Sequence, residues 1–238
     1  MKEKLRFETK GKKEIFDLID SRKRVIFNFL NAYSVYLFRY HKNFKEKIYN
    51  KQNFNFPDGF TVSIVLSLKN LKMISRTQGP EFTLSLLSDQ KKCKNKKQLF
   101  IGMSESDKKY ILNNFPHLKN EEISCYPLPF IKKQKYVDKK LLSIIGKTKP
   151  DFIWIGIGNP KQEILANDLY EEVNYGKIFN VGAAFDYIRK KKKQAPKIWQ
   201  KLGFEWFYRL ITDFRHTWKK VIGSLIGFFI SFYTIKSR

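Results

Sequence analysis

The pattern of apolar and polar positions predicts short buried strands that alternate with longer helices. Residues 152–157 place aromatic and β-branched side chains in turn, which favours a buried strand. Further apolar runs predict strands at residues 24–30, 53–56, 99–103 and 176–183. Residues 123–130 contain Pro127 and Pro129, so this run is predicted to form at most an edge strand.

Helices are predicted between these strands. They cover residues 15–19, 34–49, 61–68, 79–87, 106–115 and 137–145, and one more begins near Pro160. This alternation indicates an α/β fold, with a Rossmann-like, mainly parallel sheet flanked by helices. Ligands of such sheets bind at the carboxyl ends of the strands, where we expect the polar motifs to gather: Asn31, Asp58, Gly102, residues 159–163 and residues 182–186.

The charge of the chain adds an expectation about partners. The 238 residues carry a formal net charge of +25, which favours an anionic partner such as a nucleic acid, an anionic membrane surface or a phosphorylated substrate. The alternative is a lysine-rich solvated surface without a partner. The lysines are scattered and the aromatic residues lie in apolar runs, which argues against nucleic-acid binding.

The sequence contains no pattern that predicts a metal site or a redox site. Cys93 and Cys125 form no CxxC pair, and no D-x-D pattern is present, so we expect neither a metal nor another cofactor. Two isolated cysteines favour a cytoplasmic location. The three histidines, His41, His117 and His216, do not stand in a recognisable catalytic string.

The stretch from Gly156 to Glu163, GIGNPKQE, is the most informative motif. Gly156 and Gly158 permit a tight turn after the predicted strand, and Pro160 suits the first turn of a helix. The backbone N–H groups at the beginning of such a helix attract phosphate. On its own, however, a G-x-G turn is equally compatible with any βα connection.

The longer string G-x-G-x-P-K-Q-E resembles the signature of the WecG/TagA/CpsF family of bacterial glycosyltransferases. Three further strings are similar to motifs of this family: PDG at 57–59, GAAFD at 182–186 and KLGFEWFYRL at 201–210. The resemblance covers about residues 25–215. It implies a transferase that moves a hexose or N-acetylhexosamine, of the N-acetylmannosamine type, from a UDP-sugar to a polyprenyl-diphosphate-linked sugar, with inversion, in cell-surface polysaccharide synthesis.

The resemblance also implies roles for individual residues. Asp58 corresponds to the proposed general base, while Gln162 and Arg209 correspond to residues that act on the UDP diphosphate. Glu163 is expected either to contact the substrate or to hold the loop by capping N–H groups. The remaining positions matched to the substrate pocket are Asn31, Gly156, Gly158, Asn159, Pro160, Lys161, Gly182, Phe185 and Asp186.

Two departures from the family pattern qualify this expectation. Phe29 stands where the family has a threonine, and Gln194 stands where the family has an arginine. The basic run Lys190–Lys193 could supply the missing charge. A catalytically inactive, membrane-associated homologue is therefore the alternative to an active transferase, and a basic nucleic-acid-binding protein is the alternative from another class.

The C-terminal segment predicts a membrane contact. Residues 221–235 are mostly apolar and are flanked by Lys219, Lys220, Lys236 and Arg238. The run is too short to span a bilayer, so we expect a helix that lies in the interface of an anionic membrane. The alternative is a helix that packs on the domain or on a second copy of the chain in a homo-oligomer.

We therefore expect a Rossmann-like domain at residues 1–210 and a C-terminal appendage at 211–238. Removal of residues 221–238 is expected to leave the domain folded. The expected location is the cytoplasmic face of the cell membrane, as a peripheral protein.

Overall fold

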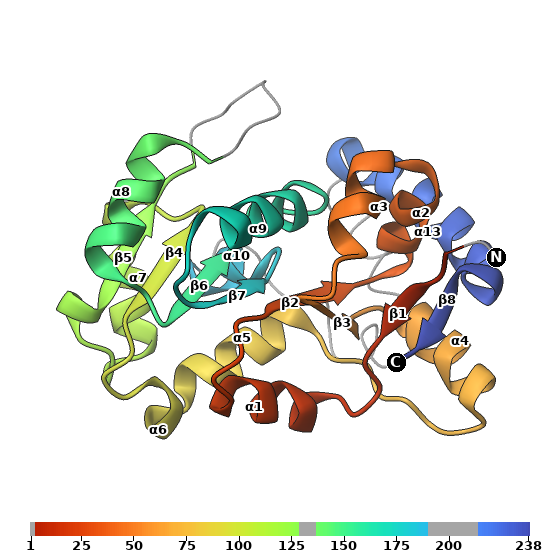
Figure 1. The fold of residues 1–238 in the computed structure, drawn as a ribbon, viewed down its shortest axis with the longest axis horizontal. Helices are drawn as coiled ribbons and strands as arrows, with labels where there is room; N and C mark the ends of the chain where they lie inside the picture. The colour runs from red at the N-terminus through yellow and green to blue at the C-terminus, as the bar shows by residue number, and fades with distance from the viewer. Residues whose placement is uncertain (1–2, 129–136, 190–213) are drawn as a thin grey trace. The chain divides into compact units, whose positions relative to one another are not determined.

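The computed structural model describes residues 3–128, 137–189 and 214–238. The chain divides into two compact units. Unit 1 comprises residues 1–15, 29–78 and 193–238, and unit 2 comprises residues 16–28 and 79–192. Within the described residues, two elements cross this division: the helix α1 (Lys12–Asp20) and the strand β2 (Ile26–Leu30). Both are labelled in Figure 1.

Six strands form a sheet in the order β3-β2-β7-β6-β4-β5. The pairs β2–β7, β7–β6, β6–β4 and β4–β5 are all parallel, which agrees with the sheet predicted from the sequence. Unit 2 contributes these strands: β4 (Gln98–Ile101), β5 (Ile123–Tyr126), β6 (Phe152–Ile155), β7 (Lys177–Asn180) and the first three residues of β2. The strand β5 lies at the edge of the sheet, as the two prolines after it predict.

Along the chain, the helices of unit 2 alternate with these strands (Figure 1). Their bounds are α5 (Gly79–Ser88), α6 (Gln90–Cys93), α7 (Lys108–Asn114), α8 (Lys139–Thr148), α9 (Lys161–Glu172) and α10 (Ala184–Ile188), with 3₁₀ turns η1 (Glu105–Asp107) and η2 (Asn120–Glu122). The short helix α6 lies in a segment for which the sequence predicts neither a helix nor a strand. Its backbone N–H groups at Lys91 and Lys92 are capped by the side chain of Asp89.

Aliphatic and aromatic residues alternate along the strands of unit 2, so the core has an aliphatic part and an aromatic part. Leu99, Ile153 and Ile178 lie in one buried cluster with residues of α8 and α9. The next residue of each strand is aromatic, and the rings of Phe100, Trp154 and Phe179 stack on one another. Successive side chains of a strand point to opposite faces, so the aliphatic residues and the aromatic residues face opposite sides of the sheet.

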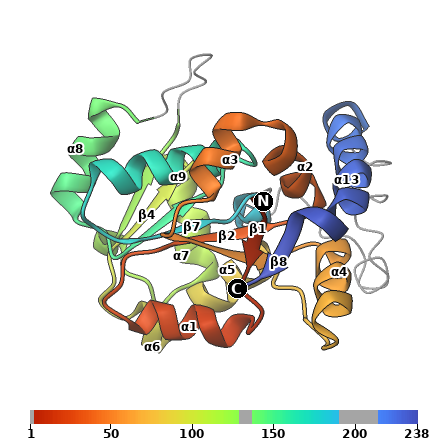
Figure 2. The ribbon, with the colours of Figure 1, turned by 45° about the vertical axis from the view of Figure 1, so that its right-hand side comes forward.

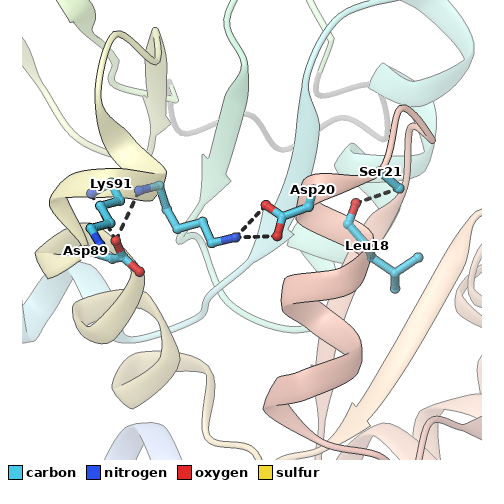
Figure 3. A network of polar contacts seen from close by, with 6 residues as sticks. Leu18, Asp20, Ser21, Asp89 and Lys91 are labelled. Carbon is cyan, nitrogen blue, oxygen red and sulfur yellow. Dashed lines mark hydrogen bonds and ion pairs between the residues drawn. The ribbon is translucent and has the colours of Figure 1, made fainter.

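The aromatic side of the sheet is covered by α1, α5 and α10. Phe82 of α5 lies against Phe179 and against Phe16 of α1, and Phe185 of α10 lies against Phe100. The helix α1 is also joined to α6 by an ion pair between Asp20 and Lys92, next to the Asp89 cap and the bond from Ser21 to the Leu18 carbonyl (Figure 3). These contacts hold the second half of α1, from Phe16 onward, within unit 2.

Unit 1 contains the other end of the chain as well as its beginning. Its elements are β1 (Leu5–Phe7), α2 (Ala32–Tyr40), α3 (Lys42–Ile48), β3 (Asn53–Pro57), α4 (Phe60–Asn70), α13 (Phe214–Thr234) and β8 (Ile235–Ser237). The sequence predicts one helix over residues 34–49, but the structure has two. His41 separates them in an extended conformation, and its Nδ1 accepts a hydrogen bond from the Phe44 N–H at the beginning of α3.

The C-terminal segment packs within unit 1. The helix α13 lies against α2 and contacts α4 (Figure 2). Gly223 faces the rings of Tyr33 and Tyr36, and Gly227 approaches the backbone of Ala32 so closely that a Cβ there would overlap the Ala32 carbonyl. The strand β8 then pairs in parallel with β1 to form a second, two-stranded sheet. Neither β1 nor β8 was predicted from the sequence.

One face of α13 remains exposed. Ser231 and Thr234 are buried on the inner side, whereas Phe229 and Tyr233 are 68% and 82% exposed. We call the exposed apolar face the α13 stripe; it consists of Trp218, Ile222, Leu225, Ile226, Phe229, Phe232 and Tyr233.

The packing of the inner face of α13 matches the alternative expectation that the C-terminal segment packs on the domain. Among the helices in the described ranges, none combines the length and apolarity that a bilayer span requires. The expected boundary between residues 210 and 211 lies outside the described residues.

Candidate functional site

The first group of predicted site residues lies in unit 1, where β2 and β3 end. Asp58 follows β3 directly, and its backbone N–H donates to the Leu30 carbonyl at 3.0 Å. Gly59 follows as the N-cap of α4, and a Cβ at this position would lie 3.1 Å from the Cβ of Asn31. The fold therefore brings Asn31 and the PDG turn together, as the sequence predicts.

Asn31 has a structural function at this position. Its side-chain oxygen accepts from the Ser34 N–H at 3.3 Å, and the Ser34 hydroxyl accepts from the Asn31 N–H at 3.3 Å, which forms a capping box at the beginning of α2. The residue is nevertheless exposed. Asn31 thus fixes the start of α2 and is exposed beside the PDG turn.

Asp58 is half-buried at the end of its strand. The neighbouring strand residues are buried, with Phe29 of β2 and Phe56 of β3 in ring contact at 6.2 Å. Phe29, which the resemblance aligns with a threonine of the family, belongs to this apolar layer. A carboxylate that stands at the edge of an apolar layer and still reaches solvent can accept a proton from a bound hydroxyl group.

The second group of predicted site residues lies in unit 2, in the turns after β4, β6 and β7. Gly102, Gly158 and Gly182 have φ values of 105°, 85° and 56°. These conformations are strained for residues with a Cβ, which explains why each of the three strands is followed by glycine. The three turns form one edge of the parallel sheet, where a ligand of this fold class binds.

Gly156 and Phe185 are matched to the pocket by their motifs, and the structure brings them into contact. A Cβ at Gly156 would overlap the ring of Phe185, which is fully buried. The turn after β6 therefore lies directly on α10, the helix that follows β7. In the described structure Phe185 acts as packing beneath the turn, whereas Asp186 beside it is half-buried.

Gln162 and Glu163 are both buried at the beginning of α9. The Gln162 side-chain oxygen accepts from the N–H of Gly158 at 3.2 Å and from the N–H of Gly182 at 3.1 Å. Its Nε2 donates to the Glu163 carboxylate at 2.9 Å, and Asn159 Nδ2 donates to the same oxygen at 3.3 Å. Glu163 thus holds the loop through side-chain amides, whereas the sequence suggests capping of N–H groups.

This network changes the expectation about the helix N-terminus. The Gly158 N–H belongs to the loop that was expected to offer free N–H groups to a phosphate, but it is bound to Gln162. Pro160, which follows a cis peptide bond, has no N–H to offer and precedes the exposed Lys161. The basic side chain of Lys161 is the charged group of the motif that reaches solvent.

An ion pair next to the turn after β4 was not predicted. Arg189, at the end of α10, donates to the Gly102 carbonyl at 2.8 Å and to the Asp107 carboxylate at 2.7 Å. The hydrogen bond from Arg189, with further bonds from Ser104, holds the pKa of Asp107 well below its usual range. The pair fixes the glycine turn of β4 to α10. Its sequence signal is weak, because Arg189 stands at the start of a basic run.

A buried amide pair near the same edge was also missed. Asn180 Nδ2 donates to Asn28 Oδ1 at 2.7 Å, and both side chains are almost fully buried. The two residues lie opposite each other on β2 and β7, as the last pair in the register of these strands. An asparagine inside each of two apolar strands was the available signal, since buried polar residues need a specific partner.

Several predicted residues lie outside the described ranges. They are Arg209, the string at 201–210, the basic run Lys190–Lys193 and Gln194. Their roles stay predictions. Within residues 3–128, 137–189 and 214–238, no group of three or more His, Cys, Asp or Glu side chains is arranged to hold a metal ion.

A mainly parallel α/β sheet with glycine turns at its carboxyl edge defines the class of proteins that bind a ligand at that edge. The sequence matches the profile of the glycosyl transferase WecG/TagA/CpsF family over residues 5–238. The chain belongs to this family.

Two curated relatives are similar over most of the chain. Both are named N-acetylglucosaminyldiphosphoundecaprenol N-acetyl-beta-D-mannosaminyltransferase. The protein from Bacillus spizizenii is 29% identical over 174 residues, which are 71% of this chain and 64% of the relative. The protein from Bacillus subtilis is 27% identical over 180 residues, which are 74% of this chain and 66% of the relative. The aligned region thus spans slightly less than two thirds of each relative.

Proposed function

We propose that this chain is a UDP-sugar-dependent transferase that moves an N-acetylhexosamine of the N-acetylmannosamine type to a polyprenyl-diphosphate-linked sugar. Membership in the glycosyl transferase family and the names of the two relatives support the reaction class and the acceptor. The proposed place of the reaction is cell-surface polysaccharide synthesis.

The observation that carries the proposal is the position of Asp58. Asp58 is half-buried at the carboxyl end of β3. It directly precedes Gly59, the N-cap of α4, whose Cβ position lies against Asn31. A sugar hydroxyl is a poor nucleophile until a base removes its proton, and a carboxylate at such an edge can serve as this base. The peptide N–H of Asp58 is held by β2, which keeps the turn in place.

The proposed chemistry is a single displacement. The acceptor hydroxyl oxygen bonds to the anomeric carbon of the donor while Asp58 takes the hydroxyl proton. The bond from that carbon to the diphosphate breaks, and UDP leaves with the bonding electrons. Attack opposite the leaving group inverts the anomeric configuration. Gln162 shapes the donor site, and Arg209 is proposed to stabilise the leaving diphosphate with its charged, bidentate side chain.

We also propose that the α13 stripe brings the protein to the membrane that holds the acceptor. The stripe presents aromatic and aliphatic side chains to solvent, and Lys219 and Lys220 beside it are exposed. An amphipathic helix with these features binds the interface of anionic bilayers. Arg238 was expected to add to the basic flank, but it is paired with Glu8 inside unit 1.

The test is UDP release from a panel of UDP-sugars in the presence of a short prenyl-diphosphate-linked N-acetylglucosamine. We expect release only with both substrates and a preference for the N-acetylmannosamine donor. Release that does not require the acceptor would indicate hydrolysis. If no donor is turned over while UDP still binds, the chain is an inactive homologue and the proposal is wrong.

A further inference from the structure

The side chain of Gln162 connects two turns of unit 2 through a single oxygen atom. This Oε1 accepts from the N–H of Gly158, in the turn after β6, and from the N–H of Gly182, in the turn after β7. Both glycines have positive φ, and open space lies where their Cβ atoms would be. The two turns therefore expose backbone on one side and are bound to Gln162 through their N–H groups.

Glu163 determines which end of the Gln162 amide faces the glycines. The carboxylate of Glu163 is fully buried and accepts hydrogen bonds from Gln162 Nε2 and Asn159 Nδ2. A backbone N–H can only donate, so the N–H groups of Gly158 and Gly182 both require an acceptor from Gln162. The Glu163 oxygen in turn accepts from the Gln162 NH₂ group. A flipped Gln162 amide would place its oxygen against the carboxylate and its NH₂ group against two N–H donors. Glu163 therefore allows one orientation.

We propose that Gln162 and Glu163 are positioning residues that fix the two glycine turns in the shape that binds the sugar-nucleotide donor. This proposal rests on the proposed transferase function, because the turns matter as a donor site only in such an enzyme. Gln162 acts through Gly158 and Gly182, and Glu163 acts through Gln162. A rigid, preformed backbone binds a ligand without having to be ordered first.

The proposal assigns Gln162 a role different from direct contact with the diphosphate. The side chain is 3% exposed, and both ends of its amide are bonded to protein groups. It also explains the motif as a unit. The turn requires glycine at 158, the glycines require the Gln162 oxygen, and the orientation of that oxygen requires Glu163.

A matched pair of variants tests the role of Gln162. Gln98 is a second buried glutamine of unit 2, 1% exposed, whose Oε1 accepts from Trp154 Nε1 at 3.0 Å. It lies at the beginning of β4, whereas the turns follow the ends of β6 and β7. Gln162→Leu and Gln98→Leu should both lower the melting temperature. Only Gln162→Leu should raise the KM for the donor, by roughly tenfold or more, with a smaller change in the acceptor KM.

Amide hydrogen exchange in the ligand-free protein separates positioning from direct contact with the donor. In the wild type and in Gln98→Leu, the amides of Gly158 and Gly182 should be protected. In Gln162→Leu both should exchange faster, while the amides of β6 and β7 stay protected. Unchanged exchange at both glycines in Gln162→Leu would overturn the proposal.

Glu163 variants test whether this residue acts through Gln162. Glu163→Leu removes the acceptor and should raise the donor KM about as much as Gln162→Leu. Glu163→Gln keeps an acceptor oxygen and should recover much of the loss. The double variant Gln162→Leu/Glu163→Leu should be within about twofold of Gln162→Leu, because residues that act as one unit are not additive. Multiplied effects would contradict the proposal.

A milder change guards against variants that do not fold. Asn159→Ala removes a hydrogen-bond donor to Glu163 and leaves Gln162 in place. It should raise the donor KM severalfold, with faster exchange at Gly158. A donor KM equal to that of the wild type, with unchanged exchange, would overturn the role of the network.

Failure of the proposed function gives a different result. The wild type would then show no turnover of any UDP-sugar. In that case the exchange pattern of the variants would still show whether Gln162 and Glu163 hold the two glycine turns.

Discussion

Asp58 gives the clearest prediction for a single residue. Asp58→Asn keeps the size of the side chain and removes the base, so transfer should fall by roughly 10²–10⁴-fold while UDP affinity stays within about twofold. Initial rates of UDP release and calorimetry with UDP measure the two effects. Asp89→Asn is the control, because Asp89 caps α6 and asparagine is an equally good cap. Turnover close to that of the wild type in Asp58→Asn would remove Asp58 from the mechanism.

The roles of individual residues were only partly predictable from the sequence. The motifs identify Asn31, Asp58, Gln162 and Glu163 as important positions. The structure brings Asn31 and Asp58 together within unit 1, and Gln162 and Glu163 together within unit 2. A sequence motif does not say which atom a side chain contacts. Gln162 and Glu163 carry the same polar groups whether they face a ligand or the two glycine turns, and the burial that decides between these possibilities comes from the tertiary packing of α9.

At the scale of elements, close packing of α13 on α2 depends on glycine. A Cβ at Gly227 would overlap the Ala32 carbonyl, a backbone group that cannot rotate away. Gly227→Ala should therefore separate the helices and cost about 1–3 kcal/mol. Gly146→Ala in α8 is the control, since nothing lies within 4 Å of the position of its Cβ. There the better helix propensity of alanine should be neutral or stabilising, by up to about 1 kcal/mol.

Thermal melts of the two glycine variants provide the comparison. The expected result is a lower melting temperature for Gly227→Ala and an equal or higher one for Gly146→Ala. Equal melting temperatures for Gly227→Ala and the wild type would mean that α13 does not pack on α2 in solution.

The buried Glu8, which directly follows β1, is predicted to make the stability of the protein depend on pH. Burial raises the pKa of Glu8 to about 7 from an ordinary value of 4.5, although the hydrogen bond from Arg238 opposes this shift, and Glu14 adds a smaller rise. The folded state therefore holds the proton more tightly than the unfolded state. The stabilisation that this provides is fully present below about pH 4.5 and is lost as the pH rises through 7.

Glu8→Gln tests this pH dependence. The glutamine cannot ionise, so the difference in stability between the variant and the wild type should shift in favour of the variant by about 1–3 kcal/mol between pH 5 and pH 8. Chemical unfolding at both pH values measures the shift. Glu3→Gln is the control, because Glu3 belongs to an exposed pair with Lys45. A pH-independent difference between Glu8→Gln and the wild type would contradict the raised pKa.

The elements of the fold differ in how far their sequences determine them. The strands β2, β3, β4, β6 and β7 were predicted because each is an apolar run followed by a turn residue. The strands β1 and β8 are three residues long, and their pairing joins Leu5 to Ile235 across almost the whole chain. No local sequence pattern predicts a pairing between residues so far apart in the chain. Likewise, the break at His41 depends on one side-chain cap inside a segment with good helical periodicity.

For the whole molecule, the packing of α13 changes the expectation that the C-terminal segment can be removed without loss of the fold. Removing residues 221–238 would delete β8, the glycines that pack on α2 and the partner of the buried Glu8. We therefore expect the truncated chain to lose the cooperative unfolding of unit 1. Loss of vesicle binding by such a truncation would not identify the membrane contact, so substitutions on the exposed face are needed.

The final prediction tests the α13 stripe with the fold left intact. Ile222 and Phe229 are 50% and 68% exposed, so Ile222→Asp/Phe229→Asp adds charge without opening the core. Binding to anionic vesicles should fall by about tenfold or more, because each charge must enter the apolar part of the interface. Leu71→Asp is the control, since Leu71 is 96% exposed but lies outside α13.

Co-sedimentation with anionic and neutral vesicles measures binding, and a thermal melt shows whether each variant is folded. Transfer to a long-chain lipid acceptor should decrease in the stripe variant, while transfer to a soluble short-chain acceptor should not, because the stripe brings the enzyme to the bilayer and takes no part in the chemistry. Undiminished binding of a folded stripe variant would mean that the basic surface of the remaining protein holds the membrane.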